Sequence, residues 1–284
     1  MNTLMPLAVQ ETKALRQLAN RLRQHAIRMT AAAGSGHPGG SLGMADVFAA
    51  LYGRILRHDP KNPTWPDRDR LILSNGHICP VQYAALAETG YFPTGELLTL
   101  RKLGSRLQGH PERGALPGLE TTSGPLGAGL AQAAGMAVAA RMDGRSHRIF
   151  CITSDGEHDA GLHWESVLFA GARGLDNLTC LVDCNGIQLS GDTETIMPLG
   201  SLVEKYRAFG WEAKEIDAHD FEQIIDALSP DPSRDRPYAV IAKNTPGKGV
   251  SFMENDWHWH GKAPNEAQAK QALQELQAAA SEST

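Results

Sequence analysis

The sequence predicts an α/β protein with a parallel sheet flanked by helices. Short apolar segments that fit strands alternate with longer segments that fit helices between residues 148 and 242. Strands separated by helices imply right-handed crossovers, which make neighbouring strands parallel. The chain has 284 residues, of which 42% are apolar, and this is enough for a large core. We therefore expect residues 1–284 to form a single domain.

The first third of the chain is expected to be mainly helical. Apolar residues recur on one helical face over Glu11–Ala33, which predicts a long helix. The helix ends at the glycine-rich segment Gly34–Gly40, which we expect no regular element to accommodate. A second helix is expected over Leu42–Leu56. A proline-rich loop over His58–Pro66 then leads to a short apolar strand, Arg70–Leu73, which runs into the turn sequence Ser-Asn-Gly-His.

The remaining chain supplies the alternation of strands and helices. An alanine-rich helix is expected over Leu130–Met142, where small side chains allow close packing. The elements expected after it are strand Arg148–Thr153, helix Leu162–Arg173, strand Leu178–Val182, helices Leu202–Phe209 and Phe221–Leu228, and strand Tyr238–Ala242. A loop over Thr245–Pro264 and a helix over Glu266–Ala280 close the chain. Only the last few residues are expected to lack order.

Composition excludes several classes of protein. The net charge of −5 argues against a nucleic-acid partner, which a basic stripe would indicate. No apolar run is long enough to span a bilayer, and Met1–Gln10 does not resemble a targeting signal, so we expect a cytoplasmic protein without membrane contact. The four cysteines form no CxxC pair, and we expect them to be buried thiols and neither disulfides nor zinc ligands.

Polar residues follow two of the expected strands. Ser154–Glu157 comes directly after one apolar strand, and Asp183–Ile187 follows the next. Both segments therefore lie at the carboxyl ends of parallel strands, where open α/β sheets bind ligands. Carboxylate, amide and carbonyl oxygens suit Mg²⁺ or Ca²⁺, and Mg²⁺ is commonly completed by substrate phosphates. Gly156 allows close approach of a phosphate, so a diphosphate ligand is indicated. The alternative is a pair of ordinary turns.

Further motifs add a family resemblance. Five segments occur in the order found in transketolases, namely Gly34–Gly40, Ser74–His77, Gln108–Glu112, Ser123–Gly127 and His260–Pro264. Asp155 and Asn185, thirty residues apart, resemble the thiamine diphosphate motif of these enzymes. From about Glu11 to Pro264 the chain is similar to their amino-terminal half, above all to the separate amino-terminal subunit of split transketolases. The resemblance implies a thiamine diphosphate-binding fold, here its pyrophosphate-binding domain.

The resemblance also implies the ligand-binding residues. The metal, Mg²⁺ with Ca²⁺ or Mn²⁺ as substitutes, is expected on Asp155, Asn185 and the carbonyl of Ile187. The residues expected to bind thiamine diphosphate are His77, Gly124, Pro125, Leu126, Gly156, Glu157, Asn185 and His260.

Four histidines are expected to act on the substrate. By resemblance, His37, His77, His110 and His260 surround the reacting atoms, and an imidazole suits proton transfer near neutral pH. The cofactor supplies the electron sink of the reaction. His158 and His163 are more simply residues at the entry and on the face of a helix. His258 and His260 lie two positions apart without an evident third ligand, which argues against a metal pair.

The chain has Ser154 where the family commonly has the first glycine of Gly-Asp-Gly, a change between small residues that should preserve metal binding. The sequence departs more strongly from the family at two further points. The acidic residue of a Glu-Gly pair after the metal aspartate is Ala160 here, with Asp159 one position earlier. In the family this glutamate belongs to a carboxylate network between the two cofactors, so we expect weaker communication between sites with the chemistry retained. The second departure is the missing pyrimidine-binding half, which in the family supplies the activating glutamate and the residues that hold the sugar phosphate.

These observations lead to a functional hypothesis. We expect the amino-terminal subunit of a transketolase of the pentose phosphate pathway, which transfers a two-carbon ketol unit from a ketose phosphate to an aldose phosphate. The partner is a separate carboxy-terminal subunit, most simply in an α2β2 heterotetramer. Alternatives are a related ketol transferase with another acceptor, of the dihydroxyacetone synthase, sulfosugar, branched-sugar or secondary-metabolism kind, and a non-catalytic assembly protein. The class of plain nucleotide-binding modules is disfavoured because neither glycine fingerprint of such modules is present.

Overall fold

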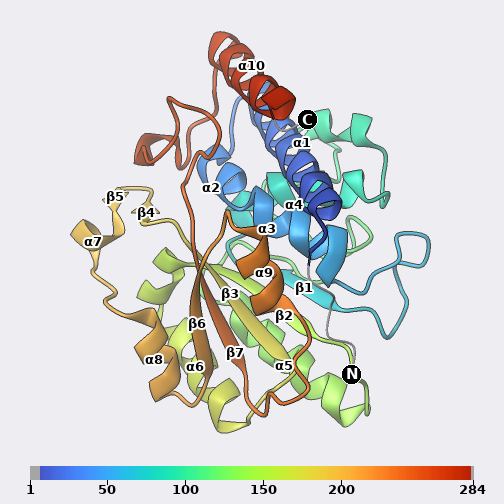
Figure 1. Cartoon of the computed structure of the whole chain (residues 1–284), viewed down its shortest axis with the longest axis vertical. Helices are drawn as coiled ribbons and strands as arrows, with labels where there is room; N and C mark the ends of the chain where they lie inside the picture. The colour runs from blue at the N-terminus through green and yellow to red at the C-terminus, as the bar shows by residue number, and fades with distance from the viewer. Residues whose placement is uncertain (1–6, 283–284) are drawn as a thin grey trace.

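The computed structural model of the chain describes residues 7–282, and its centre is a five-stranded sheet (Figure 1). All neighbouring strands pair in parallel, which confirms the predicted fold class. The strands in spatial order are β1 (Arg70–Leu73), β2 (Ile149–Ser154), β3 (Leu178–Cys184), β7 (Tyr238–Lys243) and β6 (Glu212–Asp217). The disorder expected at the end of the chain concerns residues that lie mostly outside the described range.

Helices cover both faces of the sheet. Alternate strand residues point to opposite faces, so Phe150 and Ile152 join one buried apolar cluster and Ile149 and Cys151 join the other. The first cluster includes the helices α3 (Ala45–Ala50), α4 (Cys79–Glu88) and α9 (Phe221–Leu228). The second includes α5 (Gly129–Met142), α6 (Gly161–Ala172) and α8 (Leu202–Ala208).

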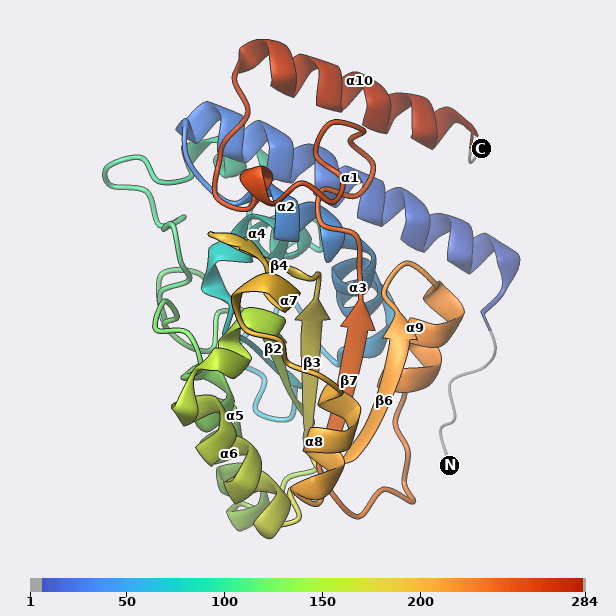
Figure 2. The same cartoon turned by 90° about the vertical axis from the view of Figure 1, so that its left-hand side faces the viewer.

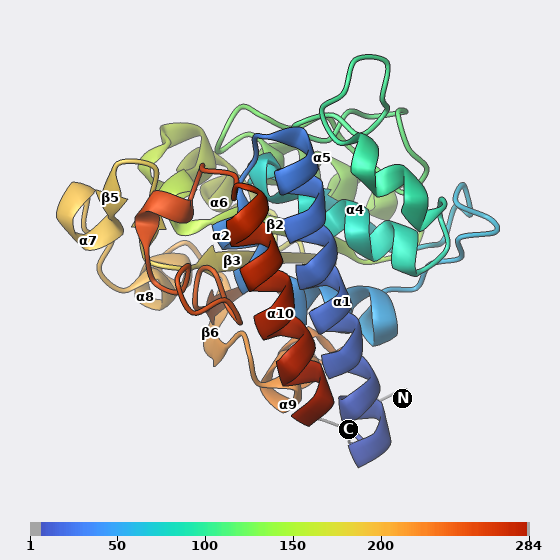
Figure 3. The same cartoon turned by 90° about the horizontal axis from the view of Figure 1, so that it is seen from above.

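The carboxyl ends of the strands point toward a layer made by the two ends of the chain. In Figure 2 the arrowheads of β3 and β7 point toward α2 (Pro38–Gly43) and the long helices α1 (Val9–Ala33) and α10 (Glu266–Glu282). Figure 3 shows α10 running beside α1. The Asn20 side chain on α1 donates to the Leu276 carbonyl on α10 over 2.8 Å. Leu276 shares an apolar cluster with Trp259, so α10 also anchors the loop before His260.

The glycine-rich segment corrects one expectation, because part of it is helical. Pro38 takes the first position of α2, where its missing N–H costs nothing, and Gly39 and Gly40 continue the helix. These glycines are required by packing. A Cβ on Gly39 would lie 3.1 Å from the Trp259 carbonyl oxygen, and one on Gly43 would lie 2.3 Å from the Asn244 amide oxygen. Close contact with neighbouring loops therefore outweighs the low helix propensity of glycine.

The helix expected over Leu42–Leu56 is divided into shorter pieces. α2 ends at Gly43, Met44 leaves the helical conformation, and α3 continues as a wide π-helical turn over Leu51–Ile55. The other short elements are the strands β4 (Ile187–Gln188) and β5 (Gly191–Asp192), the helix α7 (Thr193–Ile196), and 3₁₀ segments over Gly76–Ile78, Thr94–Thr99, Asp155–Asp159 and Trp257–Trp259.

Two longer elements carry no clear sequence signal. α4 is buried along nearly its whole length, so no polar face produces a helical period. β6 is an edge strand with the sequence Glu-Ala-Lys-Glu-Ile-Asp, in which only Ala213 and Ile216 are buried. Charged residues on an exposed edge protect it from pairing with other chains, but they also hide the strand from a search for apolar segments.

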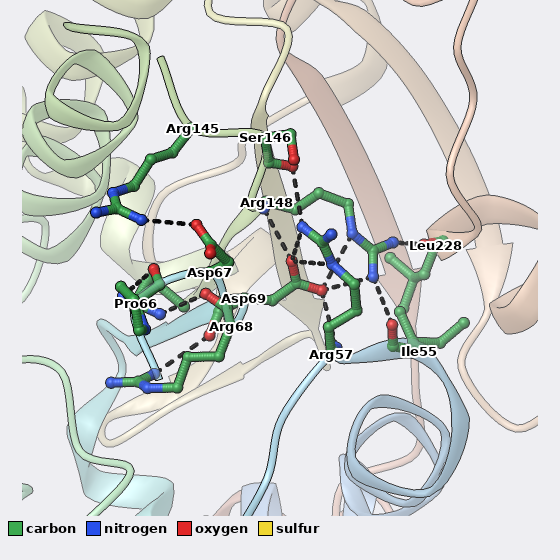
Figure 4. Close-up of polar contacts among 11 residues, drawn as sticks. Ile55, Arg57, Pro66, Asp67, Arg68, Asp69, Arg145, Ser146, Arg148 and Leu228 are labelled. Carbon is green, nitrogen blue, oxygen red and sulfur yellow. Dashed lines mark hydrogen bonds and ion pairs between the residues drawn. The ribbon is translucent and has the colours of Figure 1, made fainter. Parts of the chain in front are cut away.

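A buried carboxylate organises the end of the sheet where the strands begin, opposite to their carboxyl ends (Figure 4). Asp69 precedes β1, and its carboxylate accepts hydrogen bonds from the backbone N–H groups of Arg57 and Arg148, both over 2.9 Å. The guanidinium groups of the same two arginines complete its contacts. Arg148 also donates to the carbonyls of Ile55 and Leu228. The network joins the starts of β1 and β2 to helices on one face and is satisfied without a ligand.

Two expectations from composition can be compared with the described residues. Among the helices of residues 7–282, none combines the length and the apolar character that crossing a membrane requires. Cys79, Cys151 and Cys180 are buried free thiols as expected, whereas Cys184 at the end of β3 is only half-buried.

Candidate active site

A cavity of about 310 Å³ opens at the carboxyl ends of β2 and β3. Its lining includes nine of the predicted site residues, namely His37, His77, His110, Gly124, Leu126, Gly156, Asn185, Ile187 and His260. Ser154, from the indicated segment Ser154–Glu157, also lines it, together with Gln188 and Leu189, which the sequence had not singled out. Pro125, Asp155 and Glu157 are not part of the lining. The structure thus brings together segments that are as far apart in the sequence as His37 and His260.

Three of the histidines form a compact group. Their ring centroids are 5.1 Å apart for His37 and His77, 5.1 Å for His77 and His260, and 5.7 Å for His37 and His260. His37 precedes α2, His77 lies in the 3₁₀ segment after β1, and His260 follows the loop held by α10. Three separate loops therefore converge on one point above the sheet.

The histidine rings are held in the neutral form. Burial, the His260 ring and the Arg101 charge lower the pKa of His37 to about 4. Burial is also the largest cause that lowers the pKa values of His77, His110 and His260. The buried Nδ1 of His37 has no hydrogen-bond partner within the described structure. Neutral imidazoles with a free nitrogen can accept a proton from a bound ligand or donate one to it.

Asp155 provides a buried carboxylate at the edge of the cavity. It accepts hydrogen bonds from the N–H groups of Gly156 over 2.8 Å and Gly186 over 2.7 Å. Burial raises its pKa to about 6, and none of the ion pairs in residues 7–282 includes it. A buried carboxylate without a cationic partner is costly, and a bound cation would remove that cost.

Hard oxygen donors lie beside Asp155. The side-chain oxygen of Asn185 accepts from the Ile187 N–H over 3.0 Å, and both residues line the cavity. The described residues contain no group of three His, Cys, Asp or Glu side chains suited to a metal. A carboxylate, an amide and a carbonyl oxygen nevertheless form the mixed donor set that Mg²⁺ accepts when a phosphate completes its coordination. The residues present therefore fit a Mg²⁺–diphosphate group.

Asp183 positions three asparagines around this edge. Its carboxylate, fully buried at the end of β3, accepts from the side-chain amides of Asn75 over 3.1 Å, Asn185 over 3.0 Å and Asn244 over 2.7 Å. Burial and the nearby Asp155 charge raise the pKa of Asp183 to about 7. Asn75 precedes the His77 segment, and Asn244 begins the loop that carries His260. One carboxylate thus aligns the three parts of the site.

Glu157 lies behind the cavity wall. Its carboxylate is fully buried and accepts hydrogen bonds from the Ser74 hydroxyl, the Gly127 N–H over 2.7 Å and the Ser154 N–H over 2.8 Å. These contacts fix the loop of Gly124 and Leu126 against the ends of β1 and β2. The side chain expected to bind the cofactor is therefore placed to support a lining loop.

Ala160 and Asp159 lie close to the same wall. Ala160 is half-buried at the start of α6, and a Cβ on Gly127 would lie 2.8 Å from the Ala160 Cβ. Asp159 is exposed, and its carboxylate accepts from the side chain of Gln188 over 3.1 Å. A carboxylate is therefore present one residue earlier than in the resembled family, attached to a residue of the cavity lining.

Comparison with known proteins identifies the family. Residues 14–282 match the family described as transketolase, thiamine diphosphate binding domain. The chain belongs to the transketolase family. It carries the thiamine diphosphate-binding domain of that family, as the ordered motifs had indicated.

Relatives of this transketolase-family chain include proteins of similar length. It is 41% identical to the 6-deoxy-6-sulfo-D-fructose transketolase subunit SqwG of Clostridium sp., over 93% of this chain and 96% of that protein. It is 39% identical to an apulose-4-phosphate transketolase subunit of Actinobacillus succinogenes, over 85% of this chain and 87% of that one.

Solved structures show the same fold in longer chains. The transketolase of Campylobacter jejuni superposes with a TM-score of 0.87 and 35% identity, over 93% of this chain and 43% of that chain. This transketolase-family chain thus spans less than half of the length of such transketolases. Because both shorter relatives are called subunits, the length of this chain is typical of one part of a divided enzyme.

Proposed function

We propose that this chain is the amino-terminal, cofactor-binding subunit of a two-chain transketolase. The observation that carries the proposal is the cavity itself, where four histidines lie beside the Asp155 and Asn185 edge in a chain of the transketolase family. The enzyme would transfer a two-carbon ketol unit from a ketose to an aldose. Its active site would be completed by a carboxy-terminal chain, most simply with two copies of each.

The proposed roles follow from the geometry. Asp155, Asn185 and the Ile187 carbonyl would hold Mg²⁺, and the backbone of Gly156, which lines the cavity without a side chain, would lie beside the diphosphate. Bound thiamine diphosphate supplies a carbon nucleophile and an electron sink. Mg²⁺ binding would hold Asp155 ionised and offset its burial.

The histidines would orient the sugar and move its protons. His37, His77 and His260 surround one volume and are neutral, so each can bind a substrate hydroxyl as donor or acceptor. His110 lines the same cavity outside this compact group, where it can bind a further hydroxyl of the sugar. His37 also lines this cavity and is a candidate to exchange a proton with a substrate hydroxyl.

The sugar that the enzyme accepts is open to a second proposal. The relative from Clostridium sp. is called a sulfofructose transketolase subunit, and its 41% identity favours a test of sulfosugars beside sugar phosphates. A comparison of sulfofructose and a ketose phosphate as donors, with one aldose acceptor, would separate the two classes. Higher kcat/KM for the sulfonate would favour the sulfosugar over the pentose phosphate substrates.

The test of the proposed function is reconstitution. Ketol transfer is measured for this chain alone, for a carboxy-terminal chain such as the product of the adjacent gene, and for the mixture, with thiamine diphosphate and Mg²⁺ in each case. We expect activity only in the mixture, and we expect Asp155→Asn to remove most of it. Full activity of this chain alone would contradict the two-chain proposal. Absence of Mg²⁺-dependent cofactor binding in calorimetry would instead favour a non-catalytic assembly protein.

A further inference from the structure

Arg101 connects the loop that precedes His37 to the loop that precedes His110. One guanidinium nitrogen donates to the Ser35 hydroxyl over 3.4 Å, and another donates to the Gly109 carbonyl over 3.4 Å. Ser35 lies two residues before His37, and Gly109 directly precedes His110. A Cβ on Gly109 would lie 2.9 Å from the guanidinium carbon, so the glycine leaves space for this group. The guanidinium is therefore close to both histidines.

The positive charge of Arg101 is not neutralised by the protein. Arg101 belongs to none of the ion pairs within residues 7–282 and is exposed to solvent. Its charge acts on the cavity, because it lowers the pKa values of His37 and His110 after the larger effect of burial. Its two hydrogen bonds are long, and a guanidinium has further N–H donors, so most of its capacity is free for a ligand.

The backbone of Arg101 is held in a conformation that side chains rarely adopt. Its φ angle is 59°, in the left-handed region. The strain persists because Leu100 and Leu107 are buried on either side, and the Arg101 N–H donates to the Leu107 carbonyl over 2.9 Å. Residues held in strained conformations by their surroundings concentrate at functional sites. With this backbone conformation, the Arg101 side chain reaches both Ser35, before His37, and Gly109, before His110.

We propose that Arg101 is a specificity-determining residue that binds the anionic group of the sugar substrate beside the loops of His37 and His110. The inference rests on the proposed ketol-transfer function and names a substrate class for it, sugars that carry a phosphate or a sulfonate. Guanidinium groups match both anions with paired hydrogen bonds. The contact comes from this chain, in addition to any contact that the complementing chain supplies.

The test compares charged and neutral acceptors in the reconstituted, cofactor-loaded complex. The acceptors are an aldose phosphate, the same aldose without phosphate, and an aldose that carries a sulfonate. For Arg101→Gln we expect kcat/KM to fall about tenfold for the anion that the enzyme uses and less than about twofold for the neutral aldose, which matches the loss of one charge-assisted contact. Arg101→Lys keeps the positive charge but lacks the paired N–H donors of the guanidinium, so its loss of kcat/KM should be intermediate. The anion with the larger loss identifies phosphate or sulfonate.

A matched control and a binding measurement complete the test. Arg106 lies in the same exposed segment, but its guanidinium is engaged by Glu96, so Arg106→Gln should leave both acceptors unaffected. Titration calorimetry of the complex with the aldose phosphate, without donor sugar, should show about tenfold weaker binding for Arg101→Gln. Equal losses of kcat/KM for charged and neutral acceptors would contradict the proposal and show that Arg101 only connects the two loops. Without ketol transfer by the wild-type complex, the proposed function fails, while the calorimetry still tests Arg101.

Discussion

His158 lies in a buried polar cluster behind the cavity edge. Its Nδ1 donates to the Ser154 carbonyl over 2.9 Å, and its Nε2 accepts from the Tyr206 hydroxyl over 3.1 Å. Burial lowers the pKa of His158 to about 4 from an ordinary value of 6.5. The folded chain therefore keeps this ring neutral, whereas the unfolded chain protonates it below pH 6.5. Because the unfolded state binds the additional proton, the stability of the folded state decreases as the pH falls from 6.5 toward 4.

Replacing His158 should make the stability of the folded state depend less on pH between 6.5 and 4. Between pH 6.5 and pH 4, one such histidine lowers the free energy of unfolding by about 3 kcal/mol in total, at about 1.4 kcal/mol per pH unit. His158→Gln should reduce the slope of the unfolding free energy against pH by about 1.4 kcal/mol per pH unit. Urea denaturation at pH 6.5, 5.5 and 4.5 measures this slope. The raised pKa values of Asp155 and Asp183 act with the opposite sign, so the slopes of variant and wild type are compared directly. Equal slopes for the two proteins, or the same change in exposed His258→Gln, would contradict this assignment.

Single residues of the site were predictable where their type is unusual in its setting. The four histidines stood out because they lie in glycine-containing motifs that occur in the order found in transketolases, and the structure brings them to one cavity. Asp183 was noted only as the first residue of the segment Asp183–Ile187, without a role of its own, and Arg101 did not stand out. An aspartate at a strand end and an arginine in a polar loop are common, and their importance depends on contacts with residues that are distant in the sequence. Glu157 was predicted as a cofactor-binding residue, and that stays a prediction; its contacts with Ser74, Gly127 and Ser154 could not be predicted because they depend on the fold.

At the scale of elements, the packing of α6 against α8 depends on one glycine. A Cβ on Gly171 would lie 1.8 Å from the carbonyl oxygen of Phe209, which follows α8 directly. Backbone atoms cannot move aside cheaply, so the two elements must separate. We expect Gly171→Ala to lower the free energy of unfolding by about 3 kcal/mol, measured by urea denaturation.

Gly135 provides the matched control for this prediction. It lies inside α5, and no atom is within 4 Å of the position of its Cβ. Gly135→Ala should therefore raise the free energy of unfolding by up to about 1 kcal/mol through helix propensity alone. If both alanine variants changed stability in the same direction, this would contradict the claim that α6 packs too closely against Phe209 to admit a Cβ on Gly171.

Elements with a clear pattern were predicted well, and the missed ones have physical reasons. Four strands were expected within two residues of their observed bounds because each is a short apolar run between turns. β6 was missed because its charges face solvent at the sheet edge, and α4 because burial on all sides removes its period. The helical glycines of α2 could not be foreseen, since their cause is contact with the loops of Trp259 and Asn244.

At the scale of the molecule, the feature that matters for function is the position of the cavity on the sheet. The sheet has helices on both faces and the cavity lies at its carboxyl edge, yet the chain spans 43% of the transketolase from Campylobacter jejuni. The cavity entrance therefore has to meet another chain if the proposed function holds. The surface that surrounds the entrance should carry exposed apolar side chains, because burial of such residues drives association.

α6 presents such a surface. It begins at Gly161, directly after the turn that carries Asp155, and its outer side chains include Leu162, Leu168 and Phe169, which are 45%, 55% and 43% exposed. Leu162 lies in the first turn of α6, beside the segment that carries Asp155, and Leu168 and Phe169 lie about two turns further along the helix. Burying a leucine and a phenylalanine contributes about 1.5–3 kcal/mol each. We expect the double variant Leu168→Asp with Phe169→Asp to weaken association with the complementing chain at least about tenfold.

Analytical ultracentrifugation of the mixed chains measures this effect, and Val9→Asp is the control. Val9 is 88% exposed at the start of α1, and Figure 1 shows α1 and α6 at opposite ends of the molecule. Its replacement should leave association unchanged. The double variant alone should unfold within about 0.5 kcal/mol of the wild type, because exposed side chains contribute little to folding. Unchanged association with a folded double variant would show that α6 stays exposed in the complex, and the complementing chain would then have to approach the cavity from the side of β4 and α7, where Leu189, Ile196 and Met197 are exposed.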